Sequence, residues 1–471
     1  MNDSHSYLEP HPEFYWLGGR EIYKNAGGYA RIASLFKRVR QENPDRVIAL
    51  DNGDTIHGTY PAVSTKGHAL VPVLNKLAFD AMTGHWEFAY GPDNFKEVAG
   101  KLNYPVLAIN CYAKATNKLV FPPYLIVERG GLRIGIIGIA ATIIDKTMPK
   151  HFSEGMYFTL GNEELPNYIQ KLREQEKVDL IVVLSHLGYP QELKLVEEVS
   201  GVDVLLSGHT HNRLYQATLS NGTIFMQSGC HGSFIGRLDL EIEQGKIRDF
   251  KHQLINIDES INPDPETKSL INQVMQPYRE ILDTPVGSTR IALNRNRGLE
   301  TTMDNLLLQA IAEISETELA FSNGWRYGAP VVPGIVTMND LWNIIPPNPP
   351  VALCEITGSE IWEMLEDSLE RVFSRDPYEQ MGGYVKRCLG LNLYFKIENP
   401  KGKRIQESYI NNQPIQSEKS YTASFVTTQG IPERFGRNRR NLEIKAIEAL
   451  KQYLTKNNPA SAELKGSVVP V

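Results

Sequence analysis

The sequence lacks several features that would assign it to common classes of protein. Its longest apolar runs, such as IVVLSH and IGIIGIAA, have the length of strands, so no membrane span is expected. Only four cysteines occur, far apart and without a CxxC pair, which argues against a disulfide framework or a zinc knuckle. The net charge of −6 provides no broad basic surface, so no nucleic-acid partner is expected.

The 471 residues are enough for two or three domains, and the pattern of predicted strands and helices changes twice along the chain. Over residues 1–250, short β-rich runs such as RVIALDNGD and VDLIVVLSH alternate with amphipathic helical patterns, which predicts an α/β layered domain. Residues 251–284 contain a polar stretch and one helical pattern, and are a candidate linker. Over residues 285–471, helical patterns mix with short strands such as LNLYFKIE, which predicts a separate α+β domain.

Polar residues with metal-ligand chemistry follow the predicted strands at five points of the first domain. They occur in NDSH at the start, in DNGD, in GHWE, in SH after LIVVL, and in GHTH. Aspartate and imidazole suit divalent manganese, iron, zinc or cobalt, and a carboxylate can bridge two ions. Two such ions can hold an anionic ester, generate hydroxide and stabilise the leaving oxygen. The candidate ligands are Asp3, His5, Asp54, His85, His186, His209 and His211.

The spacing divides these ligands between two ions that share Asp54. One ion is expected to bind Asp3, His5, Asp54 and His211, and the other Asp54, His85, His186 and His209. Taken singly, a histidine after a strand is more often a hydrogen-bonded turn or core residue, and an aspartate can be a helix N-cap. Five such motifs in order at strand ends favour the metal centre. Solvated or structural roles are expected for the histidines outside these motifs, which are His11, His57, His68, His151 and His252. His231 is expected to be a turn residue, with a contact to a metal ligand as the alternative.

These motifs resemble the ordered motifs of the calcineurin-like metallophosphoesterases, and more closely those of the 5′-nucleotidase family. The run SGCHGSFIGRLDL and the later segments PVGSTR, MDNLLLQAIAE and FSNGWR extend the likeness over nearly the whole chain. The resemblance implies a four-layer α/β/β/α catalytic domain with two divalent ions, followed by an α+β 5′-nucleotidase-type C-terminal substrate domain. It also suggests that Arg326 grips a substrate oxyanion, to which guanidinium geometry is suited, with a surface arginine beside a structural aromatic as an equal alternative.

One turn departs from the family pattern. Where the family has GNHEFDYG, this chain has GHWEFAYG: His85 replaces a metal-binding Asn, Trp86 the catalytic His, and Ala89 the Asp that orients that His. General acid help of this kind is worth roughly 10²–10⁴-fold in rate, and an indole N–H does not supply a proton at neutral pH. Three outcomes stay open: His85 serves both as ligand and as acid, the leaving group needs little protonation, or the protein is slow or inactive. Trp86 is expected to form a wall of the substrate pocket.

A leaving group that needs little protonation would be a sulfur atom. A thiol has a pKa of about 8.5, so a thiolate leaves without a proton far more readily than an alkoxide does. The GHWE turn resembles that of the thiosulfohydrolase of the bacterial Sox sulfur-oxidation system, a two-manganese branch of the superfamily that cleaves a sulfonate from a cysteine-bound carrier. DPYEQMGG, at residues 376–383, shares this likeness. The GGDG-type turn of classical 5′-nucleotidases is absent from residues 424–436, where Phe425 and Phe435 either stack on a nucleotide base or are core residues.

The sequence therefore predicts a divalent-metal-dependent hydrolase of phosphoesters, with a nucleotide or related small phosphate as the first candidate substrate. Thiosulfohydrolase-like cleavage of a sulfonated carrier protein is the alternative, and a metal- or ligand-binding protein with weak catalysis is the third. Manganese is the expected metal, with zinc, iron or cobalt as alternatives. As written, the chain has no export signal and would be cytoplasmic, whereas a truncated start, indicated by the missing strand before Asp3, would allow a periplasmic or extracellular protein.

Overall fold

The computed structural model describes residues 1–471 and divides into two compact units. The first comprises Met1–His11 and Asn25–Pro277, and the second comprises Pro12–Lys24 and Tyr278–Val471. The segment expected as a linker, residues 251–284, contains the end of one strand, helix α7 (Pro265–Met275) and the short helix α8 (Arg279–Leu282). None of the helices combines the length and the apolar character needed to cross a bilayer.

The centre of the first unit is a six-stranded sheet in the order β12-β13-β11-β10-β8-β7. Strands β13, β11, β10 and β8 run parallel, and β12 and β7 pair antiparallel at the edges. The parallel strands are rich in Ile, Val and Leu, as expected for strands that are covered on both faces. The strands are β7 (Tyr124–Arg129), β8 (Leu132–Ile139), β10 (Leu180–Ser185), β11 (Val204–Ser207), β12 (Thr218–Ser220) and β13 (Thr223–Gln227).

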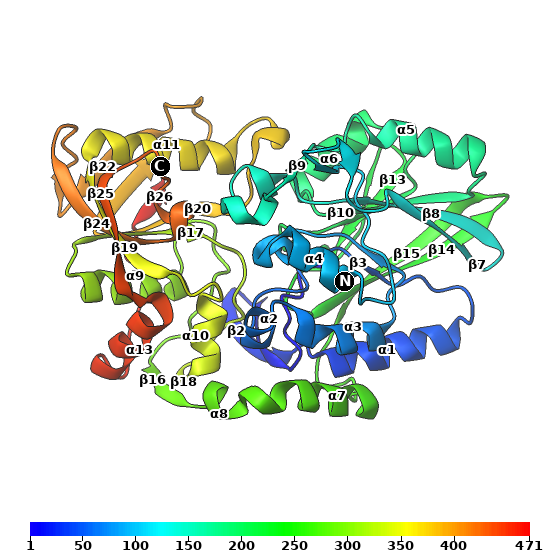
Figure 1. Ribbon diagram of the computed structural model, residues 1–471, viewed down its shortest axis with the longest axis horizontal. Helices are drawn as coiled ribbons and strands as arrows, with labels where there is room; N and C mark the ends of the chain where they lie inside the picture. Colours follow the sequence, from blue (N-terminus) through cyan, green and yellow to red (C-terminus); the bar gives the residue numbers. More distant parts are fainter. The chain divides into compact units, whose positions relative to one another are not determined.

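Side chains of this sheet alternate between two hydrophobic cores. In β10, Ile181 and Val183 pack in the core formed with helices α5 (Leu165–Gln170) and α6 (Tyr189–Glu198), whereas Leu180 packs in the core on the opposite face. Successive residues of a strand point to opposite faces, so each strand contributes to both cores. Helices α5 and α6 form the outer layer on one side of the sheet (Figure 1).

The second sheet layer is in two pieces. Strand β3 (Leu50–Asp51) pairs in parallel with β4 (Ala81–Met82), whereas β14 (Phe234–Glu243) and β15 (Lys246–Asn256) form a separate antiparallel hairpin. Alternate residues of β14, such as Leu238, pack inward against the first sheet. A cavity of about 600 Å³ reaches Met1 and is lined mainly by apolar side chains of β3, β14, the first sheet and residues 35–39.

Helices α1 (Tyr29–Glu42), α3 (Val71–Leu77) and α7 form the outer layer on the side of the second sheet (Figure 1). Helix α1 buries Tyr29, Ile32 and Leu35, which recur at a spacing of three residues and so share one face. The four-layer α/β/β/α arrangement is thus confirmed, with an interruption in its second sheet. The remaining elements of this unit are α2 (Tyr60–Ser64), α4 (Pro92–Ala99), β5 (Cys111–Ala113), β6 (Lys118–Leu119) and β9 (Met156–Phe158).

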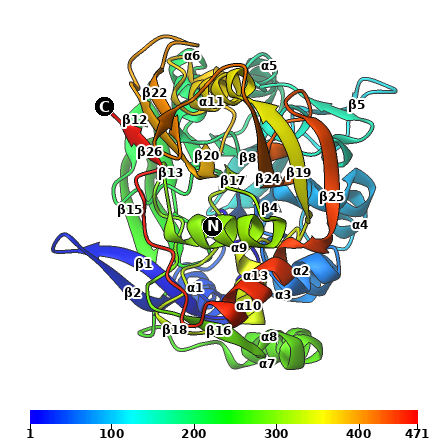
Figure 2. The ribbon, with the colours of Figure 1, turned by 90° about the vertical axis from the view of Figure 1, so that its left-hand side faces the viewer.

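The second unit is built on a five-stranded sheet in the order β20-β17-β24-β19-β25 (Figure 2). Helix α11 (Gly358–Phe373) packs Ile361 and Leu365 into the core on one face, and α9 (Thr302–Ser315) and α13 (Ala446–Lys456) lie together on the other. This mixture confirms the predicted α+β domain. The strands are β17 (Leu319–Gly324), β19 (Pro350–Thr357), β20 (Tyr384–Leu389), β24 (Ser420–Val426) and β25 (Arg437–Lys445).

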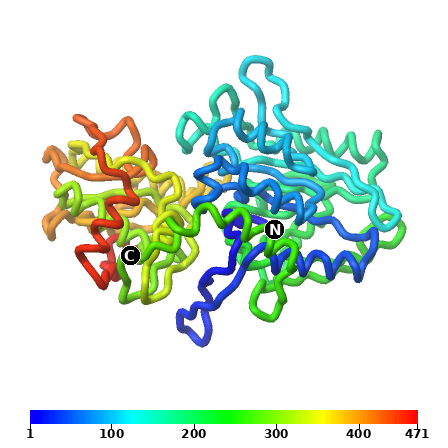
Figure 3. The backbone as a smooth tube through the Cα atoms, turned by 60° about the horizontal axis from the view of Figure 1, so that its bottom comes forward, coloured from blue at the N-terminus to red at the C-terminus, as the bar shows by residue number.

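Smaller pieces complete the second unit. A four-stranded sheet has the order β23-β22-β21-β26, and β16 pairs with β18. Figure 3 follows the hairpin formed by β1 (His11–Leu17) and β2 (Arg20–Ala26), which turns at two glycines with positive φ. The other elements are β16 (Pro285–Thr289), β18 (Gly334–Thr337), α10 (Met338–Ile344), β21 (Leu391–Phe395), β22 (Ile405–Ile410), β23 (Gln413–Pro414), α12 (Thr427–Gly430) and β26 (Val468–Pro470).

Candidate dinuclear metal centre

The seven candidate ligands lie together in the first unit, and five of them are on segments that follow the carboxyl ends of parallel strands. His85 follows β4, His186 follows β10 directly, and His209 follows β11. Such strand ends meet at one edge of an α/β sheet, where ligand sites form. Asp3 joins them because the amino-terminal segment runs beside the loop after β3, with the Asp3 amide donating to the Gly53 carbonyl at 2.9 Å.

The first group of ligands consists of Asp3, His5, Asp54 and His211, with one ligand atom from each side chain lying within 4.8 Å of the others. His211 Nε2 lies 3.2 Å from both His5 Nε2 and an Asp3 carboxylate oxygen. His5 Nε2 lies 3.9 Å from Asp54 Oδ2. These four side chains match the set that the sequence predicts for one ion.

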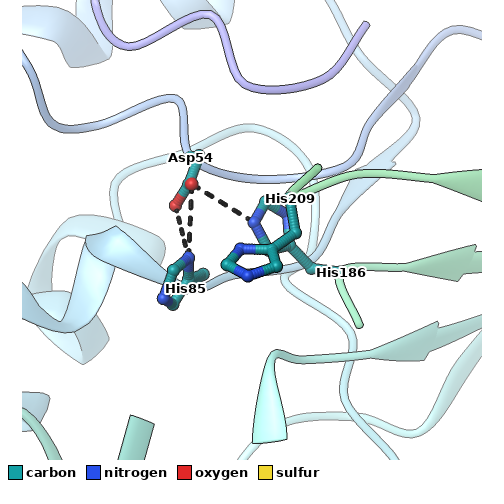
Figure 4. Close-up of side chains that lie close together, drawn as sticks. All are labelled: Asp54, His85, His186 and His209. Carbon is teal, nitrogen blue, oxygen red and sulfur yellow. Dashed lines mark hydrogen bonds and ion pairs between the residues drawn. The ribbon is translucent and has the colours of Figure 1, made fainter. Parts of the chain in front are cut away.

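The second group consists of Asp54, His85, His186 and His209, and it meets the same distance limit (Figure 4). His85 Nδ1 lies 3.0 and 3.2 Å from the two Asp54 oxygens, and His186 Nε2 lies 3.3 Å from Oδ2. The His209 ring centroid lies 4.9 Å from that of His85. Asp54 thus belongs to both groups, as expected for a carboxylate that bridges two ions.

The electrostatics of this cluster fit cations. Burial alone would raise the pKa of Asp54, but the His85 and His186 imidazoles hold it well below its ordinary value. Burial likewise opposes a charge on His186, yet Asp54 and Asp3 raise its pKa to about 10. The buried Asp54 carboxylate is therefore compensated by neighbouring imidazoles, and His85 Nε2 is buried without a hydrogen-bond partner. Divalent ions would supply the same positive charge directly.

Backbone contacts orient the ligands. The Nδ1 atom of His186 faces the Asn52 carbonyl, which leaves Nε2 directed at Asp54. A ligating histidine commonly donates its second ring N–H to a carbonyl in this way, which fixes its tautomer. The main chain is strained to bring the groups together, because Asp3, His5, Asp54, His209 and His211 all have positive φ. Strain of this kind is concentrated at functional sites.

Glu87, in the GHWE turn, ties two ligand loops together and was missed by the sequence analysis. Its Oε1 accepts from the amides of Thr55 and Ile56 at 2.7 and 3.1 Å. Its Oε2 accepts from the amides of His85 and Asp54 at 2.8 and 3.3 Å. One buried carboxylate therefore fixes the position of both His85 and Asp54. The only sequence signal was its place in the turn.

Gln227, at the end of β13, holds the GHTH loop in a similar way. Its side-chain amide donates to the Gly208 carbonyl, and its carbonyl accepts from the Thr210 hydroxyl and the Asn212 amide. Gln227 also donates to Ser207 Oγ at 2.7 Å. These bonds fix the loop that carries His209 and His211. No motif in the sequence marked this residue.

Trp86 lies beside the second group, with 6.0 Å between its ring centroid and that of His85, and it is stacked with other neighbours. Its ring lies 4.2 Å from the His57 ring at an interplanar angle of 11° and makes an edge contact with Phe152. Its amide donates to Asp54 Oδ1 at 2.8 Å. His57 Nδ1 in turn lies 3.3 Å from the Tyr90 hydroxyl. His57 therefore belongs to the surroundings of the cluster, which its place in the sequence did not reveal.

Cys230 and His231 also adjoin the first group. The Cys230 sulfur lies 3.5 Å from His231 Nδ1, and its thiol is hydrogen-bonded to the His211 side chain. Burial would raise the pKa of this thiol, but His231 and His211 lower it to about 6. The His231 amide donates to the Asp3 carbonyl at 2.7 Å, which fits the expected structural role of this residue.

The remaining candidates lie in the second unit. Arg326 is half-buried, donates from Nη2 to the Gly383 carbonyl at 2.9 Å, and lies over the Tyr384 ring at 5.0 Å. Phe425 and Phe435 are only 4% and 3% exposed and pack in the hydrophobic core, which accounts for both rings without a ligand. Tyr384 is half-buried beside Arg326, and no motif in the sequence marks this aromatic residue.

Comparison with known proteins agrees with this geometry. Residues 1–213 match the family model of the calcineurin-like phosphoesterases, and residues 280–429 match that of the 5′-nucleotidase C-terminal domain. The chain is 26% identical over 486 residues to a snake venom 5′-nucleotidase of Naja atra, covering 91% of this chain and 89% of that protein. It is also 26% identical to the trifunctional nucleotide phosphoesterase YfkN of Bacillus subtilis, covering 87% of this chain but only 31% of that longer protein.

A solved structure with the same fold is the sulfate thiohydrolase SoxB of Thermus thermophilus. It superposes with a TM-score of 0.92 at 24% identity, covering 100% of this chain and 95% of that one. At this identity the likeness concerns the fold. Calcineurin-like phosphoesterases bind two divalent ions, and the two Asp/His groups have the ligand types that such ions need. The chain therefore belongs to the calcineurin-like phosphoesterases that carry a 5′-nucleotidase C-terminal domain, and it is a hydrolase of that family.

Proposed function

We propose that this hydrolase removes phosphate from a nucleotide or a related small phosphoester. The observation that carries the proposal is the pair of ligand groups that share Asp54, because two adjacent ions suit the hydrolysis of an anionic ester. The nucleotide preference is supported by the relatives, which include a venom 5′-nucleotidase and a nucleotide phosphoesterase.

Within this proposal, the two groups each hold one ion, and manganese is the first candidate. The carboxylates and imidazoles favour divalent manganese, zinc, iron or cobalt over the harder magnesium and calcium ions. Such ions supply Lewis acidity and lower the pKa of water. The protein contributes the shared carboxylate of Asp54, the fixed tautomer of His186 and the loop positions held by Glu87 and Gln227.

Arg326 is proposed to hold an anionic part of the substrate. Its guanidinium is half-buried and fixed through the Gly383 carbonyl, and the Tyr384 ring lies against it. A fixed guanidinium loses little conformational freedom when it binds an oxyanion. Phe425 and Phe435 offer less support as substrate contacts, because both rings already pack in the core.

Cleavage of a cysteine-bound S-sulfonate is the second candidate, favoured by Trp86. The stacked indole occupies the position at which the family carries its acid, and a thiolate leaves without protonation more readily than an alkoxide. The partner would then be a sulfonated carrier protein. A metal-binding protein with weak catalysis is the remaining alternative.

The test compares hydrolysis of AMP, bis(p-nitrophenyl) phosphate and an S-sulfocysteine peptide by the same preparation with added Mn²⁺. Efficient turnover of AMP supports the proposal and argues against an enzyme that requires a sulfur leaving group. Turnover of the S-sulfonate alone makes the nucleotidase assignment wrong. If none of the three reacts, elemental analysis separates the cases, because freshly purified protein without bound metal indicates a degenerate site.

A further inference from the structure

The imidazole of His57 lies beside Trp86, the residue that stands where the family has its catalytic histidine. The His57 ring stacks flat on Trp86, with 4.2 Å between ring centroids and 11° between planes. His57 is 1% exposed and stands three residues after the shared ligand Asp54. Burial lowers the pKa of His57 to about 3, and the nearby Asp54 carboxylate opposes that shift, so the imidazole is neutral and lies within electrostatic reach of the second ligand group. The site therefore retains an N–H-bearing ring close to the position where the indole stands.

The backbone around His57 is fixed by the same carboxylate that positions the metal ligands. Glu87 accepts hydrogen bonds from the amides of Thr55 and Ile56, the two residues that precede His57. Trp86, the stacking partner, is anchored through its amide to Asp54 at 2.8 Å. Both rings of the stack are thereby held relative to the ligand cluster. This rigidity is needed for a group that must meet a transition state in one geometry.

Tyr90 gives the His57 ring a defined orientation. Its hydroxyl lies 3.3 Å from Nδ1, and burial raises the pKa of Tyr90 above its ordinary value, so the phenol keeps its proton. In the tautomer in which this phenol donates to Nδ1, the imidazole proton lies on Nε2, an arrangement common for active-site histidines. The stack on Trp86 restricts rotation of the ring. Nε2–H is then a hydrogen-bond donor that needs no change of charge.

We propose that His57 Nε2–H donates a hydrogen bond to the leaving oxygen of the phosphoester. This inference rests on the proposed phosphoesterase function and adds a catalytic residue to it. When the P–O bond breaks, the leaving oxygen takes the electron pair, and the hydrogen bond stabilises its developing charge. Water provides the hydroxyl of the released phosphate and the proton of the released alcohol, so His57 ends the cycle unchanged. A poor leaving group then does not require the acid that Trp86 displaced.

The test uses two phosphomonoesters with different leaving groups, AMP and p-nitrophenyl phosphate, and the variant His57→Phe. Phenylalanine keeps a ring against Trp86 but has no N–H. Removing one such donor costs roughly 10²–10³-fold in kcat, and the loss should fall mainly on AMP, whose leaving alkoxide is the poorer one. We therefore expect kcat for AMP to fall about 100-fold, and that for p-nitrophenyl phosphate to fall by clearly less, with bound Mn²⁺ unchanged.

Two further variants separate catalysis from structure. Tyr90→Phe removes the partner of Nδ1 and should reproduce the selective loss more weakly. His252→Gln alters a half-buried histidine on β15 and should leave the ratio of the two rates unchanged. Equal losses on both substrates in His57→Phe, or no loss, would overturn the assignment while leaving the phosphoesterase function intact. If the wild-type protein hydrolyses only the S-sulfonate, or none of these substrates, both proposals are wrong.

Discussion

The substitution Glu87→Gln tests how strongly one carboxylate organises the candidate metal centre. Glutamine retains one acceptor oxygen, so it satisfies two of the four amides that Glu87 now accepts from and turns an NH₂ group towards the other two. A buried donor left without an acceptor costs about 1–3 kcal/mol. Two such donors therefore lower the free energy of unfolding of the first domain by about 2–6 kcal/mol.

Differential scanning calorimetry measures this loss directly. For a domain of this size, 1 kcal/mol corresponds to roughly 2–4 °C in Tm, so the transition of the first domain should fall by roughly 4–24 °C. Titration calorimetry with Mn²⁺ should also show weaker binding, because the His85 and Asp54 loops lose a common anchor. The matched control is Glu163→Gln at an exposed position, where no change is expected.

A Glu87→Gln protein that loses less than about 1 kcal/mol of stability and binds Mn²⁺ as the wild type does would contradict this role of Glu87. That result would mean that water or a local shift of the backbone satisfies the amides. It would also weaken the argument for His57, because the same carboxylate fixes the Thr55 and Ile56 amides.

Two other predictions address single side chains. His85→Asn restores the family's residue type, and we expect it to retain both Mn²⁺ ions and turnover; loss of turnover at full metal content, measured by elemental analysis, would mark His85 as an acid rather than a ligand. Burial lowers the pKa of Lys386 to about 7, so between pH 7 and its unfolded value the unfolded chain binds more protons and stability rises with pH. In Lys386→Met, chemical denaturation at several pH values should show a smaller rise of the second domain's free energy of unfolding between pH 7 and the unfolded pKa of lysine. An identical rise in both proteins would contradict the lowered pKa of Lys386.

The sequence was most informative where local pattern and topology coincide. Ligands such as His186 could be placed because they follow buried parallel strands directly, and the carboxyl ends of such strands converge. The four-layer arrangement followed from the same alternation together with the family resemblance.

Contacts between distant side chains left no comparable trace in the sequence. Gln227 holds the GHTH loop from another strand, and the His57–Trp86 stack depends on how two loops approach each other. Phe425 and Phe435 were candidate substrate contacts because they lie near an expected binding turn, but both rings pack in the core. The sequence around an aromatic residue does not show whether its ring is buried.

The position of Met1 has a practical consequence for preparing the protein. Its amino group is buried and donates to the Leu50 carbonyl at 2.9 Å, at the edge of the cavity in the second sheet layer and two residues before Asp3. Residues added ahead of Met1 would lie beside that cavity and next to the segment that carries Asp3 and His5. Val471 is 58% exposed, so a tag placed there leaves the metal centre undisturbed, and metal contents measured on the two kinds of fusion should not be treated as equivalent.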